Sequence, residues 1–429
     1  MTSRADSGSR VRRTGAAAQV AGSQIGLALS NYLVLAIAAR HLDTAGFAAV
    51  SSYYLLINTV GRGLFAAVEL EATRAVADAV ARGHDTAPAV RAARRDTLRL
   101  LVVALVLAAA AGPLLGHALG GTGVAIGLLA AGAVTMAASY LLRGPLAGRR
   151  RYGLYAATFW IEAAVGLAAA AAFVVADVQG TGAWIAILAL APLVSPLVLS
   201  RPASRVPATT GAEASADATA VPPPARGGVF WSAALLLAGQ GVWNLAAVFV
   251  TSRLTDAPAV AAGFVTVAVI LRAPVLLFPA VQAILLPSFT AMLGDGDRSG
   301  VRTIVRRLGA ALAVGGVVWL VLAVFVVPWA ARLLFAATVI PPAWVLVVLA
   351  LSTVVGAAAQ IGQTRLVAER RPAAVAGAWI AGLVVLVVIA FLASPPVPAA
   401  AVGQLAAAVA VLALLAVAAR RPPDPGAAP

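Results

Sequence analysis

Long apolar runs separated by short connectors dominate this sequence and leave few folds open to it. Each run is about 20 residues or longer, enough for an α-helix rising ~1.5 Å per residue to cross ~30 Å of hydrocarbon. Hydrophobic residues make up 62% of the 429-residue chain and charged residues 11%, whereas a soluble surface needs roughly a quarter of its residues charged. We therefore predict an all-α polytopic membrane protein with about 12 transmembrane helices. The predicted spans are 15–39, 46–70, 98–117, 122–144, 154–176, 181–200, 228–252, 259–292, 309–335, 342–365, 373–393 and 397–419.

The 31 basic residues are all arginines, and they are distributed unevenly over the connectors. If the spans alternate in direction, 26 of them fall on one side and only Arg40, Arg253 and Arg332 on the other. Basic residues concentrate in cytosolic connectors, next to anionic lipids. The pattern predicts a multi-pass protein of the cytoplasmic (plasma) membrane with both termini in the cytosol. It also accounts for the net charge of +15 without a nucleic-acid partner.

One connector differs in composition from all the others. Residues 201–227 are rich in Ala, Pro, Thr and Ser and cannot bury a core. We predict that this segment is a flexible cytosolic linker between two halves of the protein. The predicted organisation is a cytosolic tail at 1–14, a six-helix lobe at 15–200, the linker at 201–227, a second six-helix lobe at 228–420 and a tail at 421–429.

The two halves resemble each other at matched places. Asn31 precedes Arg40 by nine residues, and Asn244 precedes Arg253 by nine residues. Because six is an even number of spans, two such halves have the same orientation in the membrane. This predicts a parallel repeat of two six-helix lobes.

Several classes of function lack their residues here. The chain has no cysteine, and its three histidines (His41, His84 and His117) are too scattered to suggest a metal cluster. Without lysine there is no glycine-rich nucleotide-binding loop ending in Lys-Ser/Thr. The outer connectors are too short for the large catalytic loop of a membrane glycan polymerase. We predict no metal, no cofactor and no enzymatic activity.

Two arginines are predicted to lie inside spans, Arg62 in the second and Arg272 in the eighth. An arginine in the middle of an apolar span costs about 2.5 kcal/mol or more on insertion scales, so it needs a reason. A guanidinium suits phosphate oxygens, and one arginine in each lobe would hold a diphosphate or an acidic sugar. The alternative is that each is neutralised by a fixed acid or by helix-end carbonyls, or extends to the interface.

Glu69 and Glu162 are candidates for coupling transport to protons. Glu69 lies seven residues from Arg62, on the same helix face, where it would either neutralise that arginine or titrate. Glu162 is the most isolated acid and lies inside the fifth span. A carboxyl alone in hydrocarbon tends to be neutral, which suits proton coupling. The alternative for Glu162 is an ion pair with an arginine of 143–151.

Asn31, Gln240 and Asn244 form a set of amides within the first and seventh spans. Gln240 and Asn244 are one helical turn apart. Amides lining a cavity would suit sugar hydroxyls, and interhelical hydrogen bonding gives the same pattern. Both interpretations stay open.

The eighth span contains Pro274, Pro279 and Pro287. Proline removes a backbone donor and kinks a helix. Three prolines in the span that holds Arg272 predict a bent helix lining a cavity.

Three stretches carry a family resemblance: Ala39-Arg40-His41-Leu42 through Gly46-Phe47, Glu69 through Arg74, and Leu142 through Gly153, which reads LRGPLAGRRRYG. Together they resemble the MOP superfamily (multidrug/oligosaccharidyl-lipid/polysaccharide exporters), especially its polysaccharide branch of O-antigen and teichoic-acid type. The resemblance implies an alternating-access transporter with two six-helix lobes around a central cavity. Members of the polysaccharide branch move polyprenyl-diphosphate-linked sugars across the membrane. Related lipid II flippases hold the diphosphate with cationic residues on helices one, two and eight. Here Arg62 and Arg272 match helices two and eight, and helix one has no arginine inside its span.

The leading hypothesis is therefore a flippase or exporter of lipid-linked oligosaccharide. Its expected partners are an anionic lipid-linked sugar, membrane lipids and enzymes of cell-surface glycan biosynthesis. The alternative is a proton- or sodium-coupled multidrug antiporter of the same superfamily, for which Glu69 and Glu162 supply acids. A membrane glycan polymerase or ligase is a third hypothesis, disfavoured by the short outer connectors.

Overall fold

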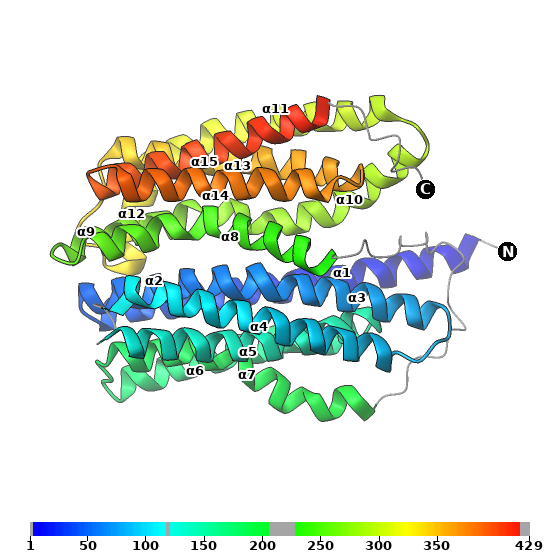
Figure 1. Ribbon diagram of the computed structural model, residues 1–429, viewed down its shortest axis with the longest axis horizontal. Helices are drawn as coiled ribbons and strands as arrows, with labels where there is room; N and C mark the ends of the chain where they lie inside the picture. Colours follow the sequence, from blue (N-terminus) through cyan, green and yellow to red (C-terminus); the bar gives the residue numbers. More distant parts are fainter. Residues whose placement is uncertain (1–2, 117–120, 206–227, 421–429) are drawn as a thin grey trace. The chain divides into compact units, whose positions relative to one another are not determined.

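The computed structural model describes residues 3–116, 121–205 and 228–420, and within these ranges it contains helices and no β-strand (Figure 1). The elements before residue 206 are α1 (Ser3–His41), α2 (Thr44–Val60), the π-helix η1 (Gly61–Phe65), α3 (Ala66–Ala81), α4 (Ala87–Gly116), α5 (Thr122–Gly148), α6 (Tyr152–Val175) and α7 (Thr181–Arg205). The later elements are α8 (Gly228–Arg253), α9 (Pro258–Leu271), the 3₁₀-helix η2 (Ala273–Leu277), α10 (Phe278–Gly294), α11 (Arg298–Phe325), α12 (Val327–Phe335), α13 (Ala343–Ala368), α14 (Pro372–Leu392) and α15 (Pro396–Arg420).

Eleven of the described helices are long and apolar enough to cross a membrane. The predicted span at 46–70 is not among these eleven, and is formed by α2, η1 and α3 in direct succession. The prediction of an all-α polytopic membrane protein is confirmed. The helices extend further into the connectors than predicted, and α1 is already helical from Ser3, inside the predicted tail 1–14.

Two predicted spans are interrupted at prolines. The span predicted at 259–292 is broken into α9, η2 and α10, with Pro274 in the first turn of η2. The span predicted as one helix at 309–335 is in fact two, because α11 ends at Phe325 and α12 begins at Val327, with Pro328 in its first turn. Proline cannot donate a backbone hydrogen bond, so it is best tolerated at the start of a helix, although Pro113 and Pro145 lie inside α4 and α5.

The chain divides into two compact units. Unit 1 contains Met1–His41 and Val60–Ala233, and unit 2 contains Leu42–Thr59 and Ala234–Pro429. The change of unit late in the chain lies close to the predicted linker 201–227, of which residues 206–227 are outside the described ranges. The second change was not predicted: α2 belongs to unit 2, while η1 and α3, which continue the same helix, belong to unit 1.

In unit 1, α5 packs against α3, α4 and α7, while α1 packs against α6. Glycines let α5 and α3 approach closely. A Cβ on Gly144 would lie 2.7 Å from the Ala72 Cβ, and one on Gly148 would lie 2.7 Å from the Thr73 carbonyl oxygen. The Thr73 hydroxyl also donates to the Gly144 carbonyl oxygen at 3.2 Å. These contacts hold α3 in place within unit 1.

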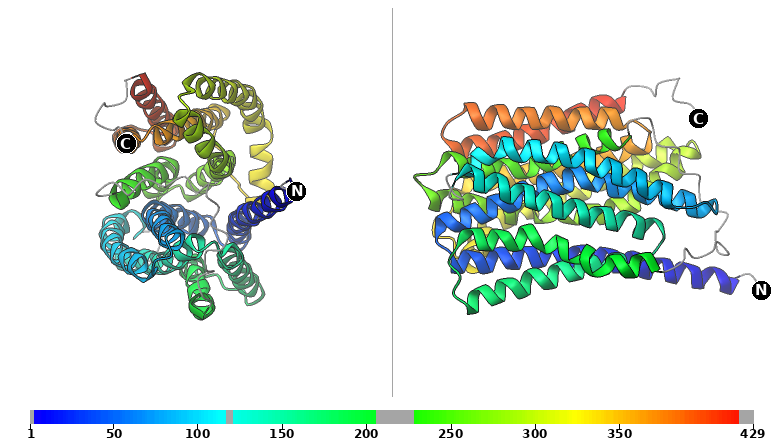
Figure 2. Two further views of the ribbon diagram at one scale, coloured as in Figure 1. Left: turned by 90° about the vertical axis from the view of Figure 1, so that its right-hand side faces the viewer. Right: turned by 60° about the horizontal axis from the view of Figure 1, so that its bottom comes forward.

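In unit 2, α13 packs against α15, α11, α10 and α9, and α14 packs against α15 (Figure 2). Helix α2 is held in this unit by buried polar contacts with α8. The Ser52 hydroxyl donates to the Thr251 hydroxyl at 2.8 Å, and the Asn244 amide donates to the Thr59 hydroxyl at 2.9 Å.

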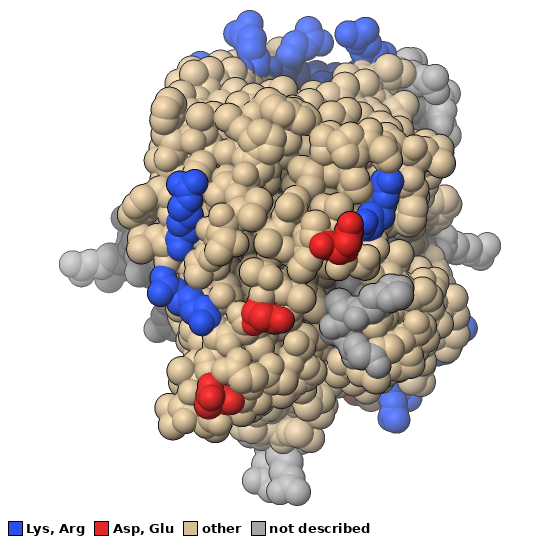
Figure 3. Space-filling model, turned by 90° about the vertical axis from the view of Figure 1, so that its left-hand side faces the viewer, with Lys and Arg blue, Asp and Glu red and all other residues tan. Residues whose placement is uncertain are grey.

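Within unit 1 the α3–α4 connector, which carries Arg82, and the α5–α6 connector, which carries Arg149, Arg150 and Arg151, lie at the end where α7 finishes (Figure 1). Figure 3 looks at the end where α1 finishes, and basic and acidic side chains are few and scattered there. Which end faces the cytosol stays a prediction.

Candidate functional site

A cluster of polar side chains lies among the apolar helices of unit 1, where burial of polar groups is costly. We call it the unit 1 cluster. Its members are Gln24 of α1, Arg62 of η1, Glu69 of α3, Tyr140 and Arg143 of α5, and Tyr155, Thr158 and Glu162 of α6. Arg143, Tyr155 and Thr158 are buried, Gln24 is exposed and the other members are half-buried.

Arg143 and Glu162 form a buried ion pair within this cluster. The guanidinium Nη2 lies 2.6 Å from the Glu162 Oε2, and the two side chains are only 4% and 11% exposed. The Arg143 Nε also donates to the Thr158 hydroxyl at 3.0 Å, and the guanidinium lies 4.0 Å from the centre of the Phe159 ring. Such a pair is well satisfied by its neighbours, so Glu162 is neutralised by a fixed cation. This is the alternative that the sequence left open for Glu162.

Glu69 has a different environment. The Tyr155 hydroxyl donates to the Glu69 Oε1 at 2.6 Å, and the Gln24 amide donates to the Tyr155 hydroxyl oxygen at 3.4 Å. Arg143 is close enough for its charge to act on Glu69, but Glu69 forms no ion pair with any described residue. Glu69 is therefore an acid held mainly by a hydroxyl, with a shared cation nearby.

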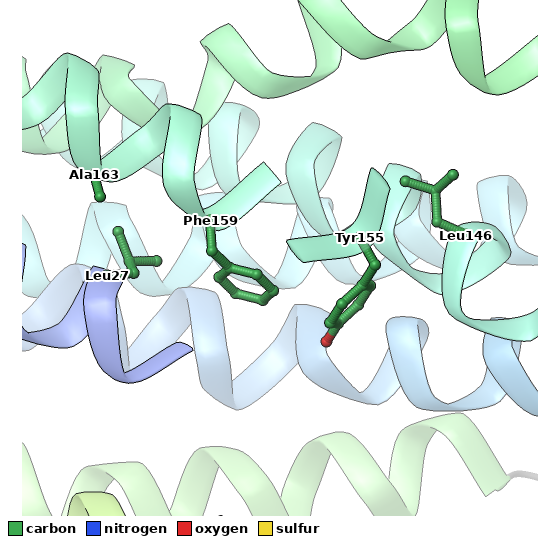
Figure 4. Close-up of a cluster of buried hydrophobic side chains, with 5 residues drawn as sticks. All are labelled: Leu27, Leu146, Tyr155, Phe159 and Ala163. Atoms are coloured by element: carbon green, nitrogen blue, oxygen red, sulfur yellow. The ribbon is translucent and has the colours of Figure 1, made fainter. Parts of the chain in front are cut away.

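Apolar side chains form one wall of the cluster. This wall is formed by Leu27, Leu146, Tyr155, Phe159 and Ala163, which pack together (Figure 4). The ring centres of Tyr155 and Phe159 lie 5.2 Å apart, in an edge-to-face arrangement. Figure 4 shows the Tyr155 hydroxyl at the end of its ring farthest from α6. This packing fixes the ring and so aims its hydroxyl at Glu69.

Arg62 is carried by the π-helix. Its neighbour Gly61 packs against the Met136 side chain, which would collide with any Cβ at that position. The charge of Arg62 acts on Tyr140, and no ion pair of Arg62 is found among the described residues. π-Helical turns are rare and are frequent at functional sites. With both arginines and both glutamates ionised, the unit 1 cluster has no net charge, and one added proton makes it positive.

Unit 2 contains the second group of predicted residues. The Asn244 amide donates to Thr59 at 2.9 Å and to the Gln240 Oε1 at 3.3 Å. The Asn244 Oδ1 is buried and accepts no hydrogen bond from the described residues. Asn31 lies in α1 of unit 1, half-buried, so the structure does not bring it together with Gln240 and Asn244 in one unit.

Arg272 lies at the junction of α9 and η2, where the eighth span is bent. Its side chain is only 8% exposed, and its Nε has no partner in the described parts of the chain. The Thr353 hydroxyl donates to the carbonyl oxygen of the preceding residue, Leu271, at 3.1 Å, which anchors the junction to α13. A buried guanidinium nitrogen without a partner is costly and is suited to receiving an anionic oxygen.

The overall structure can be compared with solved proteins. An inward-facing multidrug resistance MATE family transporter of the MOP superfamily superposes with a TM-score of 0.70 at 13% sequence identity, over 92% of this chain and 97% of that one. An outward-facing MATE family transporter gives 0.62 at 14% identity, over 94% of each chain. The eukaryotic MATE transporter AtDTX14 gives 0.58 at 12% identity, over 95% of this chain and 96% of that one.

The fold is that of the MATE transporters. No protein-family model and no curated protein matches the sequence. The MATE fold confirms the predicted two-lobed helical architecture, and it is the fold that the resemblance to the MOP superfamily implies. At these identities the likeness concerns the fold alone, so the superfamily branch and the substrate need their own arguments.

Within this MATE fold, sequence reasoning missed Arg143 and Tyr155 as site residues. Arg143 was counted among the arginines that set topology, but it belongs to α5 and is buried. A signal was present on α6, where Tyr155, Thr158 and Glu162 recur at helical spacing along one face.

Other arginines of the MATE fold are structural. Arg253 Nη1 donates to the carbonyl oxygens of Ala390 and Ala393 at 2.5 and 2.8 Å. It thereby supplies hydrogen bonds to backbone carbonyls at the C-terminal end of α14. Glu71 and Arg74 form an ion pair at 3.1 Å on the surface of α3. No group of three or more metal-ligating side chains occurs among the described residues.

Proposed function

We propose that this chain is an alternating-access membrane transporter that works as a proton-coupled antiporter. The transporter class is supported by the MATE fold, because the solved proteins that share it are transporters and include multidrug resistance proteins. The observation that carries the proton coupling is the position of Glu69, an acid inside unit 1 held by a tyrosine hydroxyl at 2.6 Å.

Glu69 suits proton coupling better than Glu162 does. Protonating Glu162 would leave the buried guanidinium of Arg143 without its counter-ion, which is strongly unfavourable. Protonating Glu69 leaves the Arg143–Glu162 pair intact and changes only the hydrogen bond with Tyr155. We therefore assign proton uptake to Glu69 and a fixed structural charge to Glu162.

A proton fits this site better than a sodium ion. Sodium needs several oxygen ligands, whereas the described neighbours of Glu69 supply one hydroxyl, Tyr155, and a positive charge, Arg143. The positive charge of Arg143 repels a metal cation at Glu69, while a proton bonded to the carboxylate needs no further ligand.

A second candidate substrate class is supported by unit 2. The buried, unpartnered Nε of Arg272 suits an anionic oxygen and disfavours an organic cation. This observation supports the transport of a lipid-linked sugar diphosphate. The antiporter proposal concerns the driving ion, so it holds for either substrate.

Reconstitution into liposomes with a trapped pH-sensitive dye tests the proposal. With an imposed pH gradient, we expect wild-type protein to move a substrate against its concentration gradient. Protons should move across the membrane in the direction opposite to the substrate. Ethidium and a fluorescent polyprenyl-diphosphate sugar are the two probes. Movement of ethidium supports a multidrug antiporter, and movement of the sugar lipid that is lost in Arg272→Gln supports the second class. Transport of either probe that is indifferent to the pH gradient would refute proton coupling.

A further inference from the structure

The first three turns of α11 carry four arginines without an acidic partner. These arginines are all exposed: Arg298, Arg302, Arg306 and Arg307. No ion pair of their side chains is found among the described residues. Other arginines of the chain are paired on their own helices, as Arg82 is with Asp78 at 2.8 Å and Arg99 with Asp96 at 3.2 Å. The start of α11 is therefore a concentration of unneutralised positive charge.

The acid nearest in sequence does not neutralise this charge. Asp297 caps α11, and its Oδ1 accepts from the Gly300 amide and from the Ser299 hydroxyl, each at 2.8 Å. These hydrogen bonds hold the pKa of the Asp297 carboxyl below its ordinary value, so it stays ionised and engaged with the helix end. Asp297 and the exposed Asp295 two residues earlier still leave at least two of the four guanidinium charges unbalanced.

Helix stability does not explain the arginines. The N-terminal end of a helix carries a partial positive charge, which favours acidic residues and disfavours basic ones there. This preference acts in the first turn and so bears on Arg298, and the same helix end attracts anions.

An exposed apolar face continues from the arginines along α11. Arg306 and Arg307 lie on the side of the helix that also presents Val314, Val317 and Val321, which are 70%, 62% and 53% exposed. Helix α11 runs along the periphery of unit 2 (Figure 2). Charge at one end and hydrocarbon along the rest match the two ends of a phospholipid.

We propose that this face of α11 is a binding surface for an acidic phospholipid. The phosphate lies against Arg302, Arg306 and Arg307, and an acyl chain lies along the exposed valines. The inference is independent of the transported substrate. It assigns the charge at this helix a specific lipid partner in addition to a role in membrane orientation.

The test uses the full-length chain in a neutral detergent, with thermal unfolding followed as phosphatidylglycerol or phosphatidylcholine is added. We expect phosphatidylglycerol alone to raise the unfolding temperature at low salt. The variant Arg302→Gln/Arg306→Gln/Arg307→Gln is expected to bind phosphatidylglycerol at least about fivefold more weakly than wild type. About fivefold is the loss in affinity expected when one basic residue near an anionic surface is removed. The corresponding triple lysine variant keeps the charge and is expected to retain the preference.

The matched control is Arg74→Gln/Arg82→Gln/Arg99→Gln, which removes three exposed arginines that already have acidic partners. Its phosphatidylglycerol response should equal that of wild type. Equal weakening in both triple variants would overturn the proposal, as would a wild type that does not distinguish the two lipids. Protection by inorganic phosphate alone would also overturn it, since it would show that the lipid is not required.

Discussion

The Tyr155 hydroxyl donates a 2.6 Å hydrogen bond to the Glu69 carboxylate and so joins α6 to α3 inside unit 1. A proton on Glu69 removes the charge that makes this bond strong, because hydrogen bonds to charged groups exceed those between neutral groups. The contact between the two helices therefore depends on the protonation of one side chain. In a transporter, this is a direct route from proton binding to helix packing.

Tyr155→Phe should move the pH profile of transport to higher pH. The ionised form of Glu69 loses a donor that stabilises it, so the carboxyl retains its proton in less acidic solution. Gradient-driven transport measured between pH 5 and 9 checks this shift. Tyr152→Phe, on the first turn of the same helix, is the control and should leave the profile unchanged. An unshifted profile in Tyr155→Phe would contradict the assigned role of its hydroxyl.

Glu162→Gln should destabilise the protein by about 3–5 kcal/mol, because it leaves the buried Arg143 guanidinium unpaired. The double variant Arg143→Met/Glu162→Gln should lose clearly less than the sum of the two single variants. Chemical unfolding in detergent measures these differences. Arg74→Gln breaks an exposed pair and should cost at most about 1 kcal/mol. Additive effects at Arg143 and Glu162 would show that the pair is not formed.

Gly263→Ala should destabilise unit 2 by about 1–3 kcal/mol, as overpacked substitutions do. A Cβ at Gly263 of α9 would collide with the carbonyl oxygen of Val339, which is backbone and cannot easily move. Gly377→Ala in α14 is the matched control, because no atom lies within 4 Å of its added Cβ. The two variants should therefore differ in unfolding temperature, and equal values would contradict the described packing of α9.

A disulfide between Ser52→Cys and Thr251→Cys should arrest transport reversibly. The two hydroxyls are 2.8 Å apart, and they hold α2 against α8 in unit 2 while α3 continues the same helix in unit 1. We expect α2, whose continuation α3 belongs to unit 1, to separate from α8 in part of the transport cycle. Because the chain has no cysteine, oxidation acts on the introduced pair alone, and reduction should restore transport.

The control for this cross-link lies wholly within unit 2. Ser352 of α13 and Gln404 of α15 are joined at 3.3 Å, and both helices belong to one bundle. Cross-linked Ser352→Cys/Gln404→Cys should transport normally. Full activity of the oxidised Ser52→Cys/Thr251→Cys protein would show that α2 stays with α8 throughout the cycle.

The class of fold could be predicted because it depends on quantities that are local in sequence. The length and apolarity of each run determine whether a helix can cross the bilayer, and proline positions such as Pro274 and Pro328 mark where helices break. The passage of the helix containing Arg62 from one unit to the other could not be predicted. It depends on contacts between residues about 200 apart in sequence, such as Ser52 and Thr251.

The candidate site was predicted in part for the same reason. Glu69, Glu162 and Arg62 are conspicuous because each is a charge inside an apolar run, and all three belong to the unit 1 cluster. Arg143 is not conspicuous, since it precedes a run of connector arginines in the sequence. Its partner Glu162 is on the next helix, so only the packing of α5 beside α6 reveals the pair. Whether these residues act in transport is a proposal that the experiments address.

Proton flux through Glu69→Gln tests the central claim most directly. The amide keeps the size of the side chain and can still accept from Tyr155, but it cannot take up a proton. In liposomes with a trapped pH dye, wild type and the control Glu71→Gln should release protons as substrate moves. Glu69→Gln should still exchange substrate at equal concentrations on both sides but should neither respond to a pH gradient nor move protons. Proton-coupled transport at the wild-type level in Glu69→Gln would contradict the account.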